Sequence, residues 1–276
     1  MHLIIQGPNV ETNDLKQLAK LSRARDITQT QPNVFRLTDA HPHTDIEVFC
    51  AQAQLDFAFV PENQTLQEIG LVVMDMDSTL ITIECIDEIA DMLQLKPQVA
   101  AITESAMRGE LDFAQSLTQR VALLTGLEQS GLQRVYDERL QLSPGAERFL
   151  AVLQQHRIKT LLVSGGFTFF TDRLKSRLNI DYSASNTLEI IDNKLTGKVL
   201  GSIVDAQSKA EHLKRLRQQL GLKHAQVVAI GDGANDLKML GEAGISIAYH
   251  AKPVVRAQAL YALNYSGLDG VLNLFT

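Results

Sequence analysis

The sequence predicts a doubly wound α/β fold with a parallel sheet, preceded by a small α+β domain. Three observations support this prediction. Short apolar runs without polar alternation recur after residue 70, which is typical of strands buried on both faces of a sheet. Helix-like segments separate these runs, at the spacing of right-handed βαβ crossovers. Before residue 61, the order of elements is βαββαβ, as in a ferredoxin-like unit.

The first unit, residues 1–61, contains four short strands and two helices. The strands are predicted at residues 2–6, 28–31, 34–38 and 56–60, and the helices at residues 13–24 and 45–55. An Asn/Asp pair is expected to cap the first helix. Residues 62–70 are polar with a terminal glycine, directly follow a proline, and are predicted to be a linker.

The second unit, residues 71–276, alternates strand and helix. Strands are predicted at residues 71–76, 158–163, 225–230 and 245–249, and helices at residues 147–156, 169–178, 208–220 and 236–240. Two insertions interrupt this pattern. Residues 83–142 have helical periodicity and no strand, which predicts a helical cap. Residues 187–200 are predicted to form a hairpin that turns at Asp192, Asn193 and Lys194.

Composition excludes several functional classes. The chain has 276 residues, a formal net charge of −6 and two cysteines, Cys50 and Cys85, so a disulfide scaffold is excluded and a reducing compartment is expected. The absence of a basic block argues against nucleic acid as a partner. No apolar stretch approaches the roughly 20 residues that span a bilayer, and no signal peptide is recognisable, so we expect a cytoplasmic protein without a membrane partner. The oligomeric state stays open between a monomer and a homodimer.

Polar side chains follow the predicted strands at their carboxyl ends, where open α/β sheets bind ligands. Asp75 and Asp77 follow the first strand, and their side chains leave the same face of an extended chain. Asp232 follows a neighbouring strand. Hard oxygen ligands without His or Cys predict a Mg²⁺ site. The alternative is that the Asp-x-Asp spacing is chance and the loop around Asp232 is an ordinary turn.

Two further features favour an anion at the same edge. Ser164, Gly165 and Gly166 lie between a predicted strand and helix, where glycines let backbone N–H groups approach a phosphate; a tight turn is the alternative. Ser208 and Glu211 have capping-box spacing, so Lys209 is expected in the first helical turn, where a cation opposes the helix dipole. A nearby phosphate would remove this conflict, and a solvated surface lysine is the alternative.

The predicted cap contributes an acidic residue, Glu84, and a positively charged one, Arg120. An apolar stripe runs through Phe113, Leu117 and Val121, and Arg120 falls on the same face, where its charge needs a partner such as a carboxylate. Glu84 follows Thr82, the expected N-cap of its helix, and either complements the helix dipole or binds a ligand. An acid and an arginine together suit a substrate that bears both an ammonium and a carboxylate group.

At these motifs the chain resembles the haloacid dehalogenase superfamily, and within it the phosphoserine phosphatases. Residues 75–79, Asp-Met-Asp-Ser-Thr, are similar to the nucleophile loop of that superfamily, and the Ser-Gly-Gly, Lys209 and Gly-Asp-Gly motifs follow in the expected order. The resemblance covers residues 71–276. It implies an aspartyl-phosphate mechanism in which Asp75 is the nucleophile and Asp77 the general acid and base.

The resemblance also implies a role for each remaining site residue. Asp75, Asp232 and the backbone carbonyl of Asp77 would hold Mg²⁺. The phosphoryl group would be bound by Ser164, Gly165 and Lys209, with Asn235 close by and Asp236 supporting Lys209 or the metal's waters. Glu84 would contact the ammonium group of the substrate, and Arg120 would contact the carboxylate group of the substrate. Met107 and Phe113 would pack over the substrate.

The activity implied by the resemblance is Mg²⁺-dependent hydrolysis of O-phospho-L-serine, the last step of serine biosynthesis. Two alternatives stay open. One is a phosphatase or phosphotransferase for another small amino-acid phosphate, since one methylene changes binding by only about 1–3 kcal/mol. The other is a non-catalytic amino-acid sensor that works through residues 1–61, which resemble an ACT-like domain.

Overall fold

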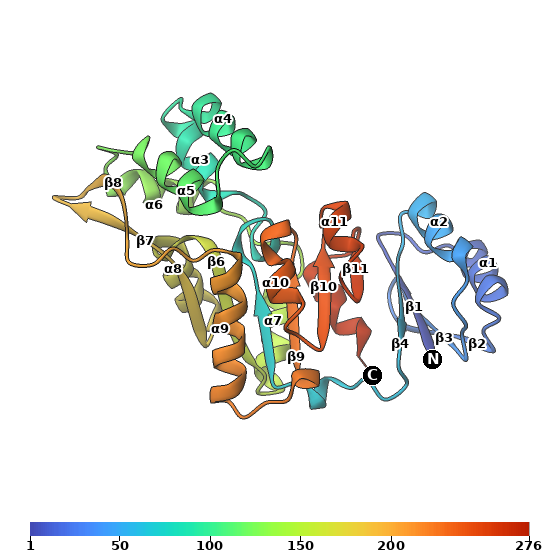
Figure 1. Ribbon diagram of the computed structural model, residues 1–276. Coiled ribbons are helices and arrows are strands. Elements are labelled where there is room, and N and C mark those ends of the chain that lie inside the picture. The colour runs from blue at the N-terminus through green and yellow to red at the C-terminus, as the bar shows by residue number, and fades with distance from the viewer. Residues whose placement is uncertain (276) are drawn as a thin grey trace.

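The computed structural model describes residues 1–275, and of Met107 it describes the backbone alone. Figure 1 shows a small sheet at the N-terminus (blue), a larger sheet beside it, and a group of helices (green) at one end of the larger sheet. This is the α/β architecture with a small α+β domain that the sequence predicts.

The N-terminal sheet is antiparallel, in the order β2-β3-β1-β4. Its unit consists of β1 (His2–Gln6), α1 (Thr12–Ser22), β2 (Asp26–Gln31), β3 (Val34–Thr38), α2 (Thr44–Ala53) and β4 (Asp56–Val60). The predicted βαββαβ order is therefore confirmed. One face of the sheet packs on α1 and α2, with Leu3 and Ile5 of β1 buried against Leu18 and Ile46.

The other face of this small sheet is also buried. Ile4, Ala58 and Val60 belong to the same apolar cluster as Leu268 and Val271 of the 3₁₀ turns η5 (Leu268–Leu274), close to the C-terminus. The sheet is thus covered by its own helices on one side and by the C-terminal segment on the other. The predicted linker contains a further 3₁₀ turn, η1 (Leu66–Glu68), which packs into the same cluster.

The larger sheet has the order β11-β10-β9-β5-β6-β7-β8, and all its pairs are parallel except β7 with β8. Its strands are β5 (Leu71–Met74), β6 (Lys159–Phe167), β7 (Tyr182–Ile191), β8 (Lys194–Leu200), β9 (Val227–Gly231), β10 (Ile245–Tyr249) and β11 (Tyr261–Leu263). A short 3₁₀ turn, η3 (His224–Gln226), precedes β9, and another, η4 (Ala234–Asp236), follows it.

Helices cover both faces of the larger sheet, which explains why its central strands β5 and β9 are apolar and buried throughout. In β5, Val72 and Met74 face one apolar cluster, whereas Leu71 and Val73 face the other. The covering helices are α7 (Ala146–Gln155) and α8 (Thr168–Leu178) on the first face, and α9 (Ala206–Gln219), α10 (Leu237–Leu240) and α11 (Pro253–Arg256) on the second.

The predicted helical insertion forms a cap of four helices over the carboxyl ends of the strands (Figure 1). They are α3 (Cys85–Met92), α4 (Lys96–Met107), α5 (Phe113–Ala122) and α6 (Gln129–Glu138). The two connections to the sheet pair with each other through an antiparallel bridge between Ile81 and Leu142. The tip of the β7–β8 hairpin also contacts the cap, since Leu195 exchanges hydrogen bonds of 2.8 Å with the backbone of Gly126 and Leu127.

Three predicted helix caps are wrong. The N-cap of α9 is Asp205, whose carboxylate accepts from the Ser208 N–H at 2.8 Å, so Ser208 and Glu211 form no capping box. The N-cap of α3 is Glu84 instead of Thr82, and that of α1 is Glu11 instead of an Asn/Asp pair. At each site several residues with capping side chains stand close together, and tertiary packing decides which of them begins the helix.

The strand predictions also need correction. Ser164, Gly165 and Gly166 lie inside β6, not between strand and helix. The hairpin turns at Asp192 and Asn193 alone, both with positive φ, while Lys194 already pairs with Ile191. The sequence analysis also missed β11 and the first half of β7, which pairs with β6, because their residues are too polar or too few for an apolar run.

Within residues 1–275, no helix has both the length and the apolar surface needed to cross a membrane.

Candidate active site

A cavity of about 420 Å³ lies between the carboxyl ends of the central strands and the cap. Asp75 and Asp77 follow β5, Ser164 and Gly165 lie in the second half of β6, and Asp232 follows β9. Parallel strands bring these loops together because their carboxyl ends meet at one edge of the sheet. The predicted site residues that line the cavity are Asp75, Asp77, Glu84, Phe113, Arg120, Ser164, Gly165, Asp232 and Asn235.

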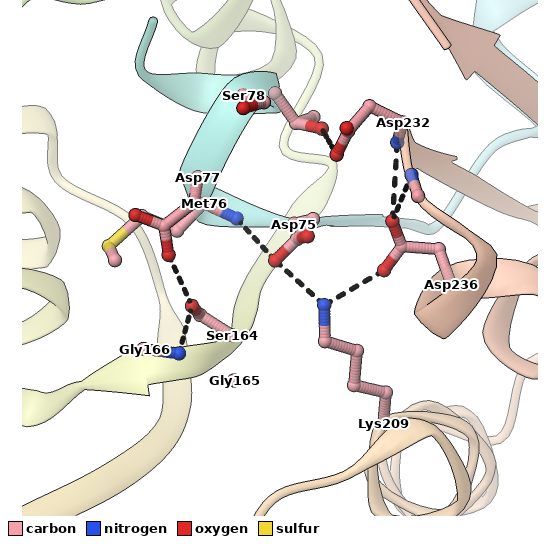
Figure 2. A network of polar contacts seen from close by, with 12 residues as sticks. Asp75, Met76, Asp77, Ser78, Ser164, Gly165, Gly166, Lys209, Asp232 and Asp236 are labelled. Atoms are coloured by element: carbon pink, nitrogen blue, oxygen red, sulfur yellow. Dashed lines mark hydrogen bonds and ion pairs between the residues drawn. The ribbon is translucent and has the colours of Figure 1, made fainter. Parts of the chain in front are cut away.

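Lys209 is buried beneath the cavity, between two carboxylates (Figure 2). Its Nζ lies 2.8 Å from Asp75 Oδ1 and 2.8 Å from Asp236 Oδ1. Burial alone would lower the pKa of Lys209, but the charges of Asp236 and Asp75 outweigh it and hold the pKa above its ordinary value. The lysine is therefore a permanent cation at the base of the site.

Asp75 is almost fully buried, and its carboxylate also accepts a hydrogen bond of 2.7 Å from the Met76 N–H. Burial raises the pKa of Asp75 well above its ordinary value, Asp236 raises it further, and Lys209 counteracts both. Asp236 is fixed from the other side, because the N–H groups of Asp232 and Gly233 donate to its Oδ2 at 3.2 and 3.1 Å. Both oxygens of Asp236 are thus occupied.

Asp75, Asp232 and Asp236 form a group that could hold a metal ion, with one oxygen of each within 4.8 Å of the others. Among the described residues, no hydrogen bond engages Asp75 Oδ2 or Asp232 Oδ2. Burial and the charge of Asp236 raise the pKa of Asp232 to about 6. Ionising these largely buried carboxyl groups costs free energy unless a positive charge lies nearby. Their free oxygens are also the ligands that a hard cation prefers. The donor set therefore fits a divalent ion at Asp75 and Asp232, with Asp236 positioned behind them.

The carboxylate of Asp77 accepts hydrogen bonds from two groups, one in the sheet and one in the cap. Ser164 Oγ of β6 donates to Asp77 Oδ2 at 3.2 Å, and the backbone N–H of Cys85, the first residue of α3, donates to Asp77 Oδ1 at 2.9 Å. Burial raises the pKa of Asp77 despite these hydrogen bonds. A raised pKa favours the protonated form that a general acid requires.

The Ser-Gly-Gly segment approaches its neighbours so closely that side chains are excluded. A Cβ on Gly165 would lie 2.8 Å from Phe113 Cζ, and one on Gly166 would lie 2.8 Å from Asp77 Oδ2. The Gly166 N–H donates to Ser164 Oγ at 2.8 Å, which holds the serine toward Asp77 (Figure 2). Glycine at both positions therefore lets the backbone form part of the cavity wall.

The cap contributes Glu84 to the cavity. Its Oε1 accepts a hydrogen bond of 2.7 Å from Ser78 Oγ, and Ser78 has a φ of 55°. Enclosure by the surrounding protein and the charge of Asp77 raise the pKa of Glu84 to about 7, although part of the side chain reaches solvent. Glu84 is thus an acid that changes charge near neutral pH.

Arg120 of α5 is half-buried and also lines the cavity. Its Nε donates weakly to the Ser116 carbonyl at 3.4 Å, and no carboxylate among residues 1–275 lies within ion-pair distance of the guanidinium. Burial lowers its pKa, while Asp87 and Glu84 counteract this effect. A half-buried guanidinium without a bonded anion is a site for an anionic ligand group.

Two predicted residues behave differently from the rest. Lys209 and Asp236 lie beneath the cavity and do not line it, although Lys209 contacts Asp75 directly. Lys209 is the fourth residue of α9. For Met107, the predicted packing over a substrate lies outside the described side chains.

The sequence analysis missed four polar cavity residues: Ser78, Asp87, Thr103 and Lys252. Lys252 lies in the loop after β10, so inspection of the loop at the end of each strand, the rule that identified the other site residues, would have found it. Its backbone N–H donates to the Asp232 carbonyl at 3.1 Å. Ser78 lies in the loop after β5 that also holds Asp77, so the same inspection would have found it. Asp87 and Thr103 lie on the cap helices α3 and α4 and carry no comparable signal.

Comparison with known proteins relates the whole chain to one family of enzymes. The family model described as haloacid dehalogenase-like hydrolase matches residues 69–244, and a model of a domain of unknown function (DUF4072) matches residues 3–46. A phosphoserine phosphatase of Polaromonas sp. is 53% identical over 214 residues, which cover 76% of this chain and 91% of that protein.

Solved structures extend the similarity. The crystal structure of a probable phosphoserine phosphatase from Vibrio cholerae, in unliganded form, has a TM-score of 0.88 at 41% identity and covers 99% of this chain and 85% of that one. A structure described as a phospho-aspartyl intermediate analogue of phosphoserine phosphatase has a TM-score of 0.70 at 36% identity, and covers 75% of this chain and 99% of that one. The similarity to the Vibrio protein therefore includes both sheets.

Proposed function

The chain belongs to the haloacid dehalogenase-like hydrolase family, and we propose that it hydrolyses O-phospho-L-serine to L-serine and inorganic phosphate. One observation supports this most strongly. A single cavity contains paired carboxylates with a buried lysine behind them, together with an acid and an unpaired arginine from the cap. This arrangement matches a ligand that carries a phosphate group together with ammonium and carboxylate groups.

Catalysis takes place in two displacements at phosphorus. Asp75 attacks the phosphoryl group and forms an aspartyl phosphate, while Asp77 gives a proton to the departing serine oxygen. Asp77 then takes a proton from the water that cleaves the aspartyl phosphate. The raised pKa of Asp77 supports this assignment, because the residue must begin the cycle protonated.

The phosphoryl oxygens are bound by Ser164, the backbone of Gly165, and Lys209, with Asn235 close by. Lys209 supplies a fixed positive charge to the transferring group, and Asp236 holds the lysine in place. Fixed charges and N–H groups directed at the transferring oxygens are the main source of catalysis in phosphoryl transfer.

The metal is proposed to be Mg²⁺, held by Asp75, Asp232 and the backbone carbonyl of Asp77. It would neutralise charge on the phosphoryl oxygens when bound. The oxygen-only donor set supports Mg²⁺ over metals that prefer nitrogen or sulfur ligands.

The cap selects the amino-acid part of the substrate. Glu84 binds the ammonium group, Arg120 binds the carboxylate, and Phe113 and Met107 pack over the carbon atoms. The reaction is expected in the cytoplasm, since Cys50 and Cys85 are free and buried, as in proteins of reducing compartments.

The test is release of phosphate from O-phospho-L-serine, O-phospho-L-threonine and an aryl phosphate, each with Mg²⁺ and with excess EDTA. We expect Mg²⁺-dependent release with a preference for phosphoserine. Activity on the aryl phosphate alone would contradict the assigned cap residues but not the catalytic loops. No release from any substrate would contradict the proposed enzyme and favour a sensor.

Arg120→Ala supplies the matched test of specificity. Loss of the guanidinium leaves the substrate carboxylate unpaired, so kcat/KM for phosphoserine should fall by the equivalent of about 2–5 kcal/mol. The aryl phosphate has no carboxylate, and its hydrolysis should change little. An equal loss on both substrates would mean that Arg120 only supports the fold.

A further inference from the structure

Asn186 of β7 lies behind the phosphate-binding segment without lining the cavity. It is 1% exposed and has no charge, so its amide must be satisfied within the protein. Its Nδ2 donates to the Gly165 carbonyl at 2.8 Å, and its Oδ1 accepts from the Val204 N–H at 2.8 Å. One side chain thus joins the end of β6 to the segment that leads into α9.

Asn186 stands where the pairing of β6 and β7 is interrupted. Val163 pairs with Ala184, but the next pair is Phe167 with Asn186, so β6 advances four residues while β7 advances two. The β6 residues between these two pairs, which have no regular partner in β7, are Ser164, Gly165 and Gly166. Because the bulge removes regular backbone pairing there, the Gly165 carbonyl takes its hydrogen bond from the Asn186 side chain instead.

The direction of this hydrogen bond determines where the Ser-Gly-Gly segment presents its donors. In a trans peptide unit, the carbonyl of one residue and the N–H of the next point in opposite directions. Because the Gly165 carbonyl points toward Asn186, the Gly166 N–H points the other way and donates to Ser164 Oγ at 2.8 Å. Ser164 in turn donates to Asp77. A rotated peptide would break this series and turn a carbonyl oxygen toward the phosphoryl group.

The second hydrogen bond connects the same amide to Lys209. Val204 precedes Asp205, the N-cap of α9, and Lys209 lies in the first turns of that helix. The Val204 carbonyl is also close to Gly165, 3.7 Å from the position of a Cβ there. Asn186 therefore holds both phosphate-binding groups, the Ser-Gly-Gly backbone and the helix of Lys209, in one relative position.

We propose that Asn186 is a positioning residue for phosphoryl binding, acting through the Gly165–Gly166 peptide and the start of α9. The proposal rests on the proposed function, since it assigns the phosphoryl group to these loops. Asn186 touches neither the substrate nor the reacting atoms. Its removal should weaken every phosphate-bearing ligand alike, whatever the leaving group.

The test is Asn186→Asp, which keeps the size of the side chain and its acceptor but loses the donor to Gly165. The Mg²⁺-loaded variant is compared with the unmodified protein for the inhibition constant of inorganic phosphate and for KM on phosphoserine and on an aryl phosphate. We expect all three constants to rise about tenfold, the equivalent of one lost hydrogen bond. These constants are independent of how much of the variant folds. Where the new carboxylate prevents folding, Asn186→Ser is used, because its shorter side chain cannot bridge both partners.

Thr171→Val is the matched control. Thr171 is buried in α8, and its hydroxyl shares a hydrogen bond of 2.7 Å with Ser185, the neighbour of Asn186 in β7. This variant should lower Tm without changing the inhibition constant of phosphate. Asn186 variants that lower Tm and leave that constant within twofold would overturn the proposal. If the unmodified protein releases no phosphate from any monoester, the proposed function fails instead, and binding of inorganic phosphate by calorimetry then tests Asn186 alone.

Discussion

Lys209 shows how much one residue of this site depends on its partners. It is 1% exposed and forms ion pairs with Asp75 and Asp236 on opposite sides. The arrangement places one positive charge between two buried negative ones. Without the lysine, both carboxylates would be buried next to each other with no compensating charge, and each would have to take up a proton to be tolerated.

We therefore predict that Lys209→Met lowers the free energy of unfolding by about 3–5 kcal/mol, besides abolishing turnover. Urea denaturation in excess EDTA measures the effect without a contribution from metal. Lys214→Met is the control, because Lys214 lies in the same helix and forms an exposed ion pair with Glu242. Exposed pairs contribute about 0–1 kcal/mol. Equal losses in the two variants would contradict the buried-charge explanation.

Glu84 makes substrate recognition depend on pH, and this dependence can be measured separately from the pH dependence of catalysis. Enclosure, the charge of Asp77 and the hydrogen bond from Ser78 together place the pKa of Glu84 at about 7. The carboxylate is therefore an anion above that pH and neutral below it. Only the anion attracts an ammonium group, so recognition of phosphoserine should be gained as pH rises through about 7 and lost as it falls.

The prediction is that the ratio of kcat/KM for phosphoserine to that for an aryl phosphate rises between about pH 6 and pH 8. The ratio removes the titration of the phosphate group, whose second pKa is about 6 in both substrates. Glu84→Gln should make the ratio independent of pH. A ratio that is already flat in the unmodified protein would count against Glu84 as the ammonium ligand.

Sequence reasoning identified the site residues whose chemistry is local and missed those that depend on the fold. Asp75 and Asp77 are recognisable because their spacing and their position after a buried strand are written in the sequence. Ser78 contacts Glu84 only because its backbone adopts a φ of 55°, which no rule for serine predicts. Asn186 lies in a strand that apolar patterning did not reveal, so its contact with Gly165 could not be anticipated.

At the scale of elements, the β7–β8 hairpin is a support for the cap. Its tip is joined to the segment between α5 and α6 by three backbone hydrogen bonds of 2.8 Å, two at Leu195 and one between the Gln129 N–H and the Asn193 carbonyl. Gly197 of β8 faces the end of α5. A Cβ there would collide with Thr125 Oγ1 and lie 3.3 Å from the Ala122 backbone. The hairpin thus sets the position of α5, and with it that of Arg120.

Gly197→Ala should therefore impair recognition through the cap as well as stability. Gly197 has a φ of +83°, so alanine adds a strain of about 1–2 kcal/mol to the collision with Thr125. We expect a lower Tm and a KM for phosphoserine that rises more than the KM for an aryl phosphate. Gly201→Ala is the control, since Gly201 has a φ of +74° and no atom within 4 Å of an added Cβ. A change of the same kind in both variants would assign the effect to strain alone.

The elements themselves differ in how far sequence can predict them. Helices with a clear apolar stripe, and strands such as β5, are correctly predicted because burial on the expected faces dictates their composition. The end of β5 was nevertheless predicted two residues late, since residues 71–76 were expected and the strand spans Leu71–Met74. The predicted ends of helices are wrong where two nearby residues both suit the N-cap position. Asp205 and Ser208 are both good N-caps, and the helix begins at the earlier one, whose carboxylate accepts a hydrogen bond from the Ser208 N–H.

At the scale of the molecule, the small sheet is attached to the rest of the chain over a whole face. Ile4 and Val60 of this face pack into the cluster that contains η5, and Gln6 Nε2 donates to the Gly270 carbonyl at 3.1 Å. The sequence held a sign of this burial, since Leu3-Ile4-Ile5 is apolar on both faces of its strand. What it could not show is the partner. That depends on the chain returning, some 260 residues later, to the open side of the sheet.

Asp56 is the strongest single link between the two sheets. Its carboxylate is 1% exposed and accepts hydrogen bonds from the consecutive N–H groups of Asn264, Tyr265 and Ser266, the shortest at 2.6 Å. These residues directly follow β11, the strand nearest the small sheet (Figure 1). Charge-assisted hydrogen bonds from three donors to one buried carboxylate are worth more than surface contacts.

We predict that Asp56→Ala costs about 3 kcal/mol and divides unfolding into two transitions, with the N-terminal unit the less stable one. Residues 264–266 lie away from the cavity, so kcat/KM of the folded variant should stay within twofold of the unmodified protein. Calorimetry resolves the transitions, and Asp26→Ala, which removes an exposed aspartate of β2 paired with Arg25, should leave the profile unchanged. A single transition at the original midpoint would mean that the apolar face alone joins the two units. In that case residues 1–61 and 71–276 would unfold as one body, and the proposed division into two domains at residues 62–70 would have to be abandoned.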